Sequence, residues 1–400
     1  HRMPPRRHDF FTFLASRSAE VIDPSSLKRK LVTRRKLRVK LGIDPTAPDL
    51  HLGHLVPLRM LRAFQDAGHQ AVLIIGDFTG QIGDPSEQSS ARRQLSAAAV
   101  KANERTYLGQ AGRILNLKRT EVRHNSQWFG RMRLSEFLGL LARFSLKSAS
   151  ERADFQKRIR TGRDVRLHEA TYHVLQAYDS VAVRADVEIG SLDQKLNILA
   201  GRELQAKLGQ APQSVVLVPY LIGLDGKAKM AKSVGNTINL RDSAKDMFGK
   251  VMSIPDALII NYAELAAWLP SGEVRGITRR LERGENPRDL KLEVATAVTA
   301  LYHGHKAARR VGDEFLRTFG RSAFPARAPL RRVASGLRPV DFVMALKGTS
   351  SHGEARRLIA GGAVEVDGRR LTLREPGVTL RPGSRVRVGK KQFYRIRQER

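Results

Sequence analysis

The sequence predicts an α/β fold built on a parallel sheet with an inserted helical segment, followed by an all-helical domain and a small basic α+β domain at the C-terminus. Three observations lead to this fold class. Short apolar runs alternate with helical patterns over residues 1–240, apolar residues keep helical spacing from Lys245 to Phe319, and the chain becomes strongly basic after a proline-containing stretch at 322–329. Short buried strands that alternate with helices favour a parallel sheet with ligand-binding loops at the carboxyl ends of its strands.

The first domain is predicted over residues 1–240. Leu37–Ile43 is a predicted strand that leads into a helix from His51 to about Ala67. The apolar run Ala71–Ile75 predicts a second strand, and three later elements continue the alternation: strands at Val183–Ile189 and Val215–Val218, and a helix at Asp193–Leu208. Residues near 125–165 have a charged helical pattern that interrupts this alternation, so we interpret them as an insertion that could carry a subunit interface.

Two further domains are predicted after the first. The helical spacing predicts a helical domain over 241–321, and the prolines and small residues that follow indicate a linker over 322–336. The C-terminal domain over 337–400 is predicted to contain a short helix at Glu354–Ala360 and a hairpin around Asp367-Gly368. Residues 331–400 hold 17 Lys or Arg against 6 Asp or Glu, a net charge of +11.

Composition narrows the classes of function. Seventy-one Lys and Arg against 39 Asp and Glu give a formal charge of +32, which favours an extended polyanion such as nucleic acid as partner. A generally basic solvated surface is the alternative. The chain has no cysteine, which excludes disulfides, iron–sulfur clusters and thiol nucleophiles, and no protein-bound zinc is expected. Its apolar runs are shorter than the roughly 20 residues of a membrane span, so we expect a cytoplasmic protein without a membrane partner.

Two short motifs suggest phosphate chemistry. His51-Leu52-Gly53-His54 lies where a strand-end loop becomes a helix, a place where backbone N–H groups and imidazoles suit phosphates. Lys229-Met230-Ala231-Lys232-Ser233 lies on a loop bordered by glycines, and its lysines could neutralise charge that develops on a leaving pyrophosphate. Either motif alone is compatible with ordinary solvated or surface polar groups.

A third set of polar residues lies on one helix. Tyr172, Gln176 and Asp179 are spaced i, i+4 and i+7, which places them on one helix face where one small ligand could contact all three. Periodicity alone is equally compatible with a buried polar network.

The two short motifs resemble the HIGH and KMSKS signatures of class I aminoacyl-tRNA synthetases. Residues 41–51, 75–86 and 167–194 are similar to bacterial-type tyrosyl-tRNA synthetases, and this resemblance extends over almost the whole chain. It implies a Rossmann-like catalytic domain, a helical anticodon-binding domain, and a C-terminal RNA-binding domain like that of a ribosomal small-subunit protein. The implied substrates are L-tyrosine, ATP with Mg²⁺, and tRNA(Tyr), and the implied assembly is a homodimer.

The resemblance also implies roles for individual residues. The tyrosine ammonium group would be bound by Asp84, Tyr172 and Gln176, the phenol by Asp179, and Gln194 would lie beside the amino acid. Asp193 would bind the ATP ribose, Lys229 and Lys232 would close over the pyrophosphate, and the rest of the ATP site would comprise Gly42, Asp44, Thr46, His51, Gly53 and His54. The tRNA backbone would contact Lys347, Arg356, Arg357, Arg369 and Arg370, although these residues could also only keep the domain soluble.

The chain departs from the family pattern at several positions. Lys40 lies where many members have a second tyrosine that reads the phenol, Ser191 and Ala177 replace frequent glycines, Ala231 replaces the middle serine of KMSKS, and Glu87-Gln88 replaces a common Gly-Lys. Ser148-Ala149 departs from larger apolar residues in the insertion. None of these positions carries an assigned chemical role.

Three alternatives remain at the level of sequence. A tryptophanyl-tRNA synthetase shares the fold and both signatures, but Tyr172, Gln176 and Asp179 favour tyrosine. A non-catalytic RNA-binding protein on a synthetase scaffold would have no physical reason to keep all four signature His and Lys residues. A small-molecule adenylyltransferase that uses only the histidine motif does not explain two RNA-facing domains.

Overall fold

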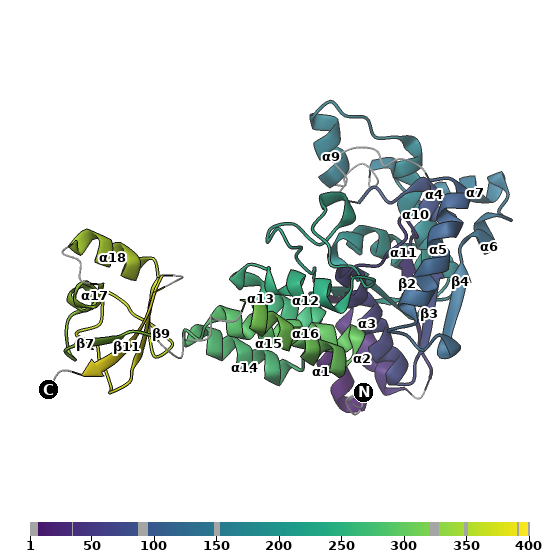
Figure 1. The fold of residues 1–400 in the computed structure, drawn as a ribbon. Coiled ribbons are helices and arrows are strands. Elements are labelled where there is room, and N and C mark those ends of the chain that lie inside the picture. The colour runs from purple at the N-terminus through teal and green to yellow at the C-terminus, as the bar shows by residue number, and fades with distance from the viewer. Residues whose placement is uncertain are drawn as a thin grey trace. The chain divides into compact units, whose positions relative to one another are not determined.

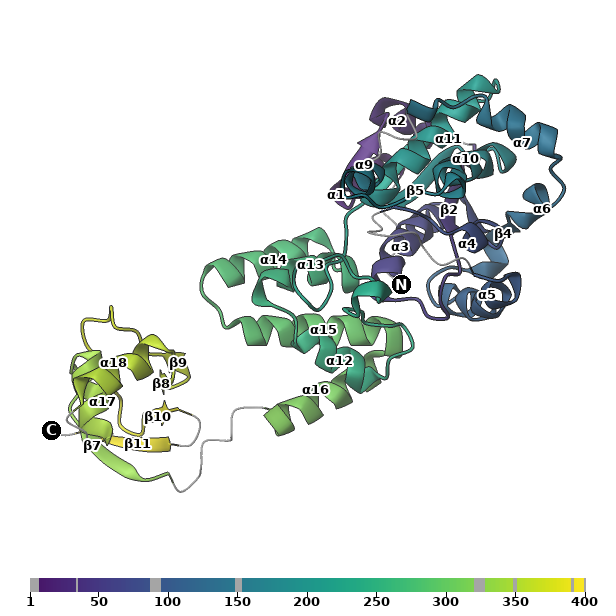
Figure 2. The ribbon, with the colours of Figure 1, turned by 90° about the horizontal axis from the view of Figure 1, so that it is seen from above.

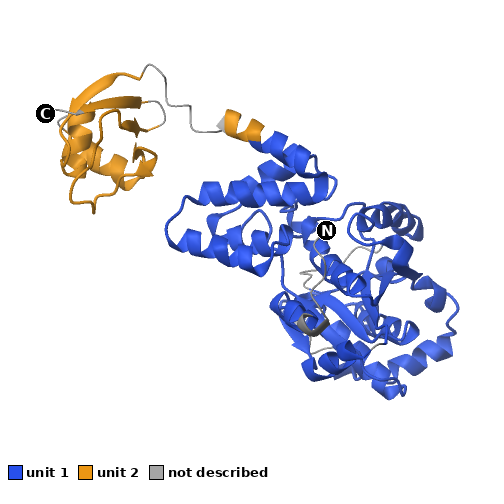
Figure 3. Cartoon of the chain, turned by 90° about the horizontal axis from the view of Figure 1, so that it is seen from below, with its two compact units in different colours: residues 1–312 blue, residues 313–400 orange. Residues whose placement is uncertain are grey.

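The structure is a computed structural model that describes residues 7–33, 35–86, 95–147, 153–319, 328–347, 351–389 and 392–398. The chain forms two compact units, residues 1–312 and 313–400 (Figure 3). Three positions or segments named above lie outside the described residues: Glu87-Gln88, Ser148-Ala149 and residues 322–327 of the predicted linker.

The first unit is built on a six-stranded sheet of order β1-β6-β5-β2-β3-β4. Figure 1 labels its strands β2, β3 and β4. Its strands are β1 (Glu20–Ile22), β2 (Arg38–Ile43), β3 (Gln70–Ile75), β4 (Thr120–His124), β5 (Val187–Ser191) and β6 (Ser214–Val218). Strands β2 to β6 pair in parallel, as predicted, and β1 adds an antiparallel edge through Val21 and Val216. The sheet is therefore mixed.

Two of these strands were not predicted, and one predicted strand begins later. β1 has only three residues, and β4 is a polar edge strand, so neither produces a continuous apolar run. The predicted strand at 183–189 begins at Val187, because α10 (Leu167–Ala182) ends just before it and Arg184 has a left-handed backbone with φ of 49°.

Helices pack on the sheet. In-register pairing places Lys40, Val72, Glu188 and Val215 on one face. That face is covered by α10 and α11 (Lys195–Lys207), whereas α3 (Leu52–Asp66) lies on the other face, below β2 in Figure 2. The remaining helices of this part are α1 (Arg7–Ser16), α2 (Pro24–Val32), α4 (Thr79–Ile82) and α5 (Ala97–Ala111).

The insertion between β4 and α10 is helical, as predicted, and contains α6 (Ser126–Phe129), α7 (Leu134–Leu141) and α9 (Ala153–Arg160). A buried bidentate ion pair joins α9 to α10, with Arg158 Nη1 and Nη2 at 2.8 and 2.9 Å from the two carboxylate oxygens of Glu169. The helix that carries Tyr172 is thereby fixed to the insertion.

Helices follow the sheet, in agreement with the predicted helical spacing. They are α12 (Ala244–Met252), α13 (Ile259–Asn261), a π-helical turn (Tyr262–Ala266), α14 (Ser271–Glu282), α15 (Pro287–His303) and α16 (His305–Phe319). Residues up to Gly312 belong to the same compact unit as the sheet.

The second unit has a five-stranded sheet of order β7-β11-β10-β8-β9 with two helices packed on it. The elements are β7 (Leu330–Val333), α17 (Pro339–Lys347), α18 (His352–Ala360), β8 (Val364–Val366), β9 (Arg369–Arg370), β10 (Arg385–Val388) and β11 (Gln392–Gln398). The predicted hairpin is present, and its turn has φ of 48° at Asp367 and 88° at Gly368. β7 lies inside the range predicted as a linker and pairs with β11.

Candidate active site

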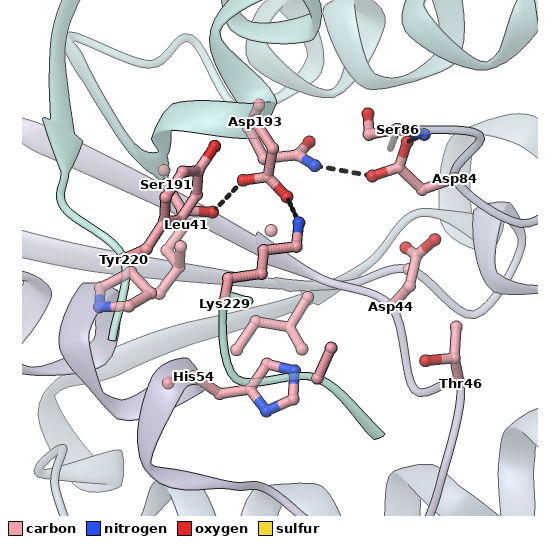
Figure 4. Close-up of a pocket in the computed structure, with 18 of the residues that line it drawn as sticks. Leu41, Asp44, Thr46, His54, Asp84, Ser86, Ser191, Asp193, Tyr220 and Lys229 are labelled. Carbon is pink, nitrogen blue, oxygen red and sulfur yellow. Dashed lines mark hydrogen bonds and ion pairs between the residues drawn. The ribbon is translucent and has the colours of Figure 1, made fainter. Parts of the chain in front are cut away.

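A pocket of about 650 Å³ opens at the carboxyl ends of β2 and β5 (Figure 4). The strand order reverses between these two strands, and parallel α/β proteins bind their ligands at such a point. Its walls come from the start of α3, one face of α10 and the loop at 228–234. Every residue assigned to ATP or tyrosine lines this pocket: Gly42, Asp44, Thr46, His51, Gly53, His54, Asp84, Tyr172, Gln176, Asp179, Asp193, Gln194, Lys229 and Lys232. The structure therefore brings both short motifs and the α10 set together.

The two histidine rings lie against one another at the start of α3, tilted by 32°. Their ring centroids are 3.7 Å apart, and the backbone N–H of His51 donates to His54 Nδ1 at 3.2 Å. Burial, followed by the nearby Lys232 and Lys229, lowers the pKa of His54 to about 3, and burial and His54 lower the pKa of His51. Both imidazoles are thus neutral at pH 7. A Cβ at Gly53 would lie 3.0 Å from His51 Nδ1, so glycine permits this close packing.

The two signature lysines have different surroundings. Lys229 Nζ lies 2.6 Å from Asp193 Oδ2 and 5.5 Å from the ring centre of Tyr220. Lys232 Nζ is buried 5.9 Å from the ring centre of Tyr107 and has no hydrogen-bond acceptor among the described residues. Burial lowers the pKa of Lys232. A buried ammonium without an acceptor is costly, and phosphate oxygens would supply acceptors.

Asn236 fixes the conformation of the lysine loop, a role that the sequence did not reveal. Its buried side chain donates to Asp225 Oδ1 at 2.9 Å and to the carbonyl of Lys229 at 3.1 Å, and it accepts from the Ala231 N–H at 2.8 Å. The signal available in the sequence was a glycine before it, Gly235, which has φ of 73°.

A hydrogen-bonded network joins the ATP side of the pocket to α10. The Tyr172 hydroxyl donates to Asp44 Oδ2 at 2.8 Å, and Thr79 Oγ1 donates to Asp44 Oδ1 at 2.8 Å. Asn125 Nδ2 donates to Thr79 Oγ1 at 2.9 Å and faces Asp179 Oδ2 at 3.4 Å. Burial and Asp44 raise the pKa of Tyr172 well above its usual value, so its hydroxyl keeps the proton that it donates.

Close packing maintains this network. A Cβ at Gly76 would lie 1.9 Å from Asp44 Oδ1 and 2.4 Å from Thr79 Oγ1. Any larger residue at position 76 would therefore displace the carboxylate. Thr79 and Asn125 were not identified from the sequence, because they lie on separate elements that only the fold brings together.

Asp179 lies at the closed end of the network. Trp128 Nε1 donates to its Oδ1 at 3.0 Å. Burial raises the pKa of Asp179 to about 7, and Lys40 and the hydrogen bonds from Trp128 and Asn125 act in the opposite direction.

Asp84 and Gln194 contact one another on the other side of the pocket. Gln194 Nε2 donates to Asp84 Oδ2 at 2.6 Å, and the Ser86 N–H donates to Asp84 Oδ1 at 2.9 Å. Asn197 Nδ2 donates to Gln194 Oε1 at 3.1 Å and orients the amide. Asp84 is thus aimed into the pocket beside Gln194.

Four of the positions at which the sequence differs from the family pattern lie among the residues that the structure describes. The Ser191 hydroxyl donates a hydrogen bond to Asp193, the residue expected to bind the ribose. Serine in place of glycine therefore adds a contact to that carboxylate. Ala231 contributes its backbone N–H to Asn236. Ala177 is buried in the cluster that contains Leu204. Lys40 is fully buried beneath the pocket and forms an ion pair with Glu188 at 2.9 Å.

The predicted tRNA-binding residues lie in the second unit. Arg356 and Arg357 are exposed on α18, and Arg370 is exposed on β9. Lys347 forms an ion pair with Glu354, and Arg369 forms one with Glu375 at 2.6 Å. Arg356, Arg357 and Arg370 are therefore the exposed members of the set for which no ion pair is found among the described residues.

Comparison with known proteins assigns the family. The sequence profile of the family described as tRNA synthetases class I (W and Y) matches residues 32–320. The tyrosine–tRNA ligase of Thermotoga maritima is 43% identical over 380 residues, which cover 94% of each chain. That of Moorella thermoacetica is 43% identical over 93% of this chain and 91% of its own length. The chain belongs to the bacterial-type tyrosyl-tRNA synthetases of class I.

Solved structures share the class I synthetase fold. A C-terminally truncated mitochondrial tyrosyl-tRNA synthetase from Aspergillus nidulans gives a TM-score of 0.65 at 22% identity, covering 78% of this chain and 94% of that one. A tryptophanyl-tRNA synthetase from Plasmodium falciparum gives 0.59 at 14% identity, covering 78% and 87%. The fold alone therefore does not distinguish a tyrosyl from a tryptophanyl synthetase. The sequence identity of 43% is to tyrosine–tRNA ligases.

No helix in the described part of the chain is long and apolar enough to cross a membrane. Among the same residues, no three His, Cys, Asp or Glu side chains gather in a way that could hold a metal ion.

Proposed function

We propose that this tyrosyl-tRNA synthetase family member activates L-tyrosine with ATP and transfers tyrosine to the 3′ end of tRNA(Tyr). The observation that carries the proposal is that both signature motifs line one pocket with Tyr172, Gln176 and Asp179. The tyrosine–tRNA ligases that are 43% identical over most of the chain support the same reaction.

The ATP end of the pocket is assigned to the two signatures. Thr46, the neutral imidazoles of His51 and His54, and the backbone from Gly42 to Asp44 would face the phosphates. Asp193 would accept hydrogen bonds from the ribose hydroxyls. Mg²⁺ would arrive on the ATP phosphates, which need no dedicated protein cage.

The amino-acid end is assigned to α10 and its surroundings. Asp84, Tyr172 and Gln176 would receive the ammonium group, with Gln194 beside the amino acid. Asp179 would accept the hydrogen bond of the phenol, and hydrogen bonds from the buried Asn125 and the partly buried Trp128 support it as a carboxylate. A site that pairs this hydroxyl rejects phenylalanine by several powers of ten.

The chemistry requires no protein nucleophile. A carboxylate oxygen of tyrosine attacks the α-phosphorus of ATP, the bond from that phosphorus to the bridging oxygen breaks, and pyrophosphate leaves. Lys232, whose ammonium lacks an acceptor among the described residues, would stabilise the charge that develops on pyrophosphate. A hydroxyl at the tRNA 3′ end then attacks the tyrosyl carbonyl carbon, and AMP leaves.

The helices over 241–321 are proposed to bind the anticodon region, and the domain over 337–400 to bind tRNA backbone through Lys347, Arg356, Arg357, Arg369 and Arg370. A net charge of +11 over residues 331–400 supports contact with phosphates, which sets affinity without reading sequence. A cytoplasmic location stays a prediction from the sequence.

A homodimer is also proposed, with the insertion near 125–165 at its interface. Five large apolar side chains from this segment or next to it are more than half exposed: Leu134, Leu138, Leu146, Ile159 and Leu167. Exposed apolar groups of this size favour a protein contact. Analytical ultracentrifugation of L134E/L138E would test it: dissociation to monomers is expected, and an unchanged dimer would exclude α7 from the interface.

Amino-acid-dependent exchange of pyrophosphate into ATP tests the proposed function. Exchange is measured with tyrosine, phenylalanine and tryptophan, without tRNA. Strong exchange with tyrosine alone is expected. Exchange with tryptophan alone would select the tryptophanyl alternative, and no exchange with any of the three would favour a non-catalytic RNA-binding protein.

A further inference from the structure

Lys40 is a charged residue buried beneath the candidate tyrosine site. It lies in the middle of β2, directly opposite Glu188 of β5, and neither side chain has more than 2% of its surface exposed. Its ammonium group has three acceptors: Glu188 Oε1 at 2.9 Å, Ser180 Oγ at 2.8 Å and the carbonyl of Gln176 at 3.2 Å. All three donors of the lysine are thus used within the protein interior.

The partner carboxylate is equally well satisfied. The Ser180 hydroxyl donates to Glu188 Oε2 at 2.9 Å, and Gln213 Nε2 donates to the same oxygen at 2.5 Å. A buried ion pair with complete hydrogen bonding is tolerated, but an apolar pair of similar volume stabilises a fold as well or better. Stability alone therefore does not explain why a lysine and a glutamate occupy these positions.

The contacts of Lys40 concentrate on the helix that lines the pocket. Gln176 and Ser180 are one turn apart on α10, and Asp179 lies between them in the chain. Lys40 therefore ties this turn of α10 to β2, and Glu188 ties it to β5. The position of Asp179 relative to the sheet depends on these contacts.

We propose that Lys40 is a positioning residue for tyrosine recognition, which holds the Asp179 turn of α10 against the sheet and places a positive charge behind Asp179, so that Asp179 binds the phenol as a carboxylate. The proposal rests on the proposed function, in which Asp179 is the phenol acceptor. Where a second tyrosine would contact the phenol directly, Lys40 acts from beneath the site.

The electrostatics agree with this geometry. The groups that shift the pKa of Asp179 come from several elements: Lys40 of β2 and the hydrogen bonds of Trp128 and Asn125 lower it, whereas burial and Asp44 raise it. The phenol of Tyr172, on the same helix, stays neutral. Loss of Lys40 removes the opposing positive charge, so Asp179 would take up a proton at higher pH than in the unsubstituted enzyme.

The test is the pH dependence of the KM for tyrosine in pyrophosphate exchange, measured on the full-length double variant K40M/E188Q. This variant removes both charges, so that no unpaired charge is left buried. The KM of the unsubstituted enzyme is expected to rise as pH falls through about 7, the pKa of Asp179. In K40M/E188Q the rise is expected to begin about one pH unit higher, with about tenfold weaker discrimination against phenylalanine at pH 7.

R158M/E169Q is the matched control, because it removes another fully buried ion pair of α10. It is expected to lower thermal stability but to leave the pH dependence of the tyrosine KM unchanged. A second variant, D179N, is expected to abolish that pH dependence, which identifies Asp179 as the titrating group.

An unshifted profile in K40M/E188Q would overturn the proposal and leave Lys40 with a structural role only. The same shift in R158M/E169Q would also overturn it, because the effect would then follow from loosening of α10. Failure of the unsubstituted enzyme to exchange with tyrosine is a different outcome, since it would contradict the proposed function itself.

Discussion

Lys229 donates to Asp193 across the pocket at 2.6 Å, so the residue assigned to the pyrophosphate of ATP contacts the residue assigned to its ribose. Asp193 is oriented by the hydroxyl of Ser191 at the end of β5. If Asp193 binds the ribose and Lys229 binds the pyrophosphate, ATP binding separates this ion pair. The carboxylate then exchanges an ammonium donor for hydroxyl donors, and the lysine exchanges a carboxylate for phosphate oxygens.

Asp193→Asn is therefore expected to weaken ATP binding, because an amide has one acceptor oxygen where the carboxylate has two to offer to the ribose hydroxyls. We expect the KM for ATP in pyrophosphate exchange to rise about tenfold, a loss of about 1.4 kcal/mol, with a smaller change for tyrosine. Ser191→Gly removes only the orienting hydroxyl and is expected to have a weaker effect. Equal increases in both KM values would argue against a specific ribose contact.

Lys232→Ala is expected to slow tyrosine activation in a single turnover by about 10²–10³, the range typical for loss of one group that stabilises transition-state charge. Tyrosine affinity, measured by equilibrium dialysis, should change little. Lys227→Ala, an exposed lysine of the same loop, is the control and should behave like the unsubstituted enzyme. A normal activation rate in the Lys232 variant would remove this residue from the chemistry.

Asp179→Ala is expected to reduce discrimination against phenylalanine by at least about a hundredfold, because the phenol loses its acceptor inside a buried site. The measurement is the ratio of kcat/KM for the two amino acids in pyrophosphate exchange. Trp128→Phe, which removes one donor to Asp179, should give a smaller decrease. Unchanged discrimination would place phenol recognition elsewhere.

Deletion of residues 322–400 is expected to separate the two half-reactions. The pocket lies wholly in the first unit, so pyrophosphate exchange should be retained, whereas charging of tRNA should fall because a domain with many phosphate contacts is lost. Charging is measured with radioactive tyrosine at two salt concentrations. An equal loss of exchange and charging would mean that the second unit supports the catalytic fold.

The histidines of the pocket, whose pKa values are lowered, predict a loss of stability in mild acid. The pKa of His54 is about 3 in the folded protein against 6.5 in a free side chain, so the unfolded chain binds a proton first as pH falls. The free energy of unfolding is therefore highest above pH 6.5 and decreases as the pH falls from 6.5 to 3. At pH 5, His54 lowers it by about 1–2 kcal/mol. Urea unfolding at pH 8 and pH 5 measures it, and His54→Asn should reduce the difference.

The sequence predicted the parallel strands and the gathering of both signatures, because apolar runs such as Ala71–Ile75 and motifs at strand ends are local signals. It missed β1 and β4, where a short or polar strand is recognised only by its pairing partner. It also missed the partners of the site residues. Thr79, Asn125 and Trp128 are distant in sequence from Asp179, and no local pattern connects them.

Lys40 illustrates a second limit. The sequence identified it as a departure from the family, but whether it enters the pocket or lies beneath it depends on the register between β2 and β5. Cross-strand pairing with Glu188 is a property of the folded sheet. The start of the C-terminal domain was placed too late for the same reason, because β7 is recognised only by its pairing with β11, more than sixty residues later.

The chain of hydrogen bonds from Tyr172 through Asp44, Thr79 and Asn125 to Asp179 has a consequence for redesign of the enzyme. If Asp179 is replaced to admit a tyrosine analogue, the side-chain amide of Asn125 loses one of its acceptors. A rearrangement of Asn125 would then disturb Thr79 and, through Thr79, Asp44 on the ATP side of the pocket. Libraries that vary Asp179 together with Asn125 and Thr79 should therefore yield more active variants than libraries that vary the pocket wall alone.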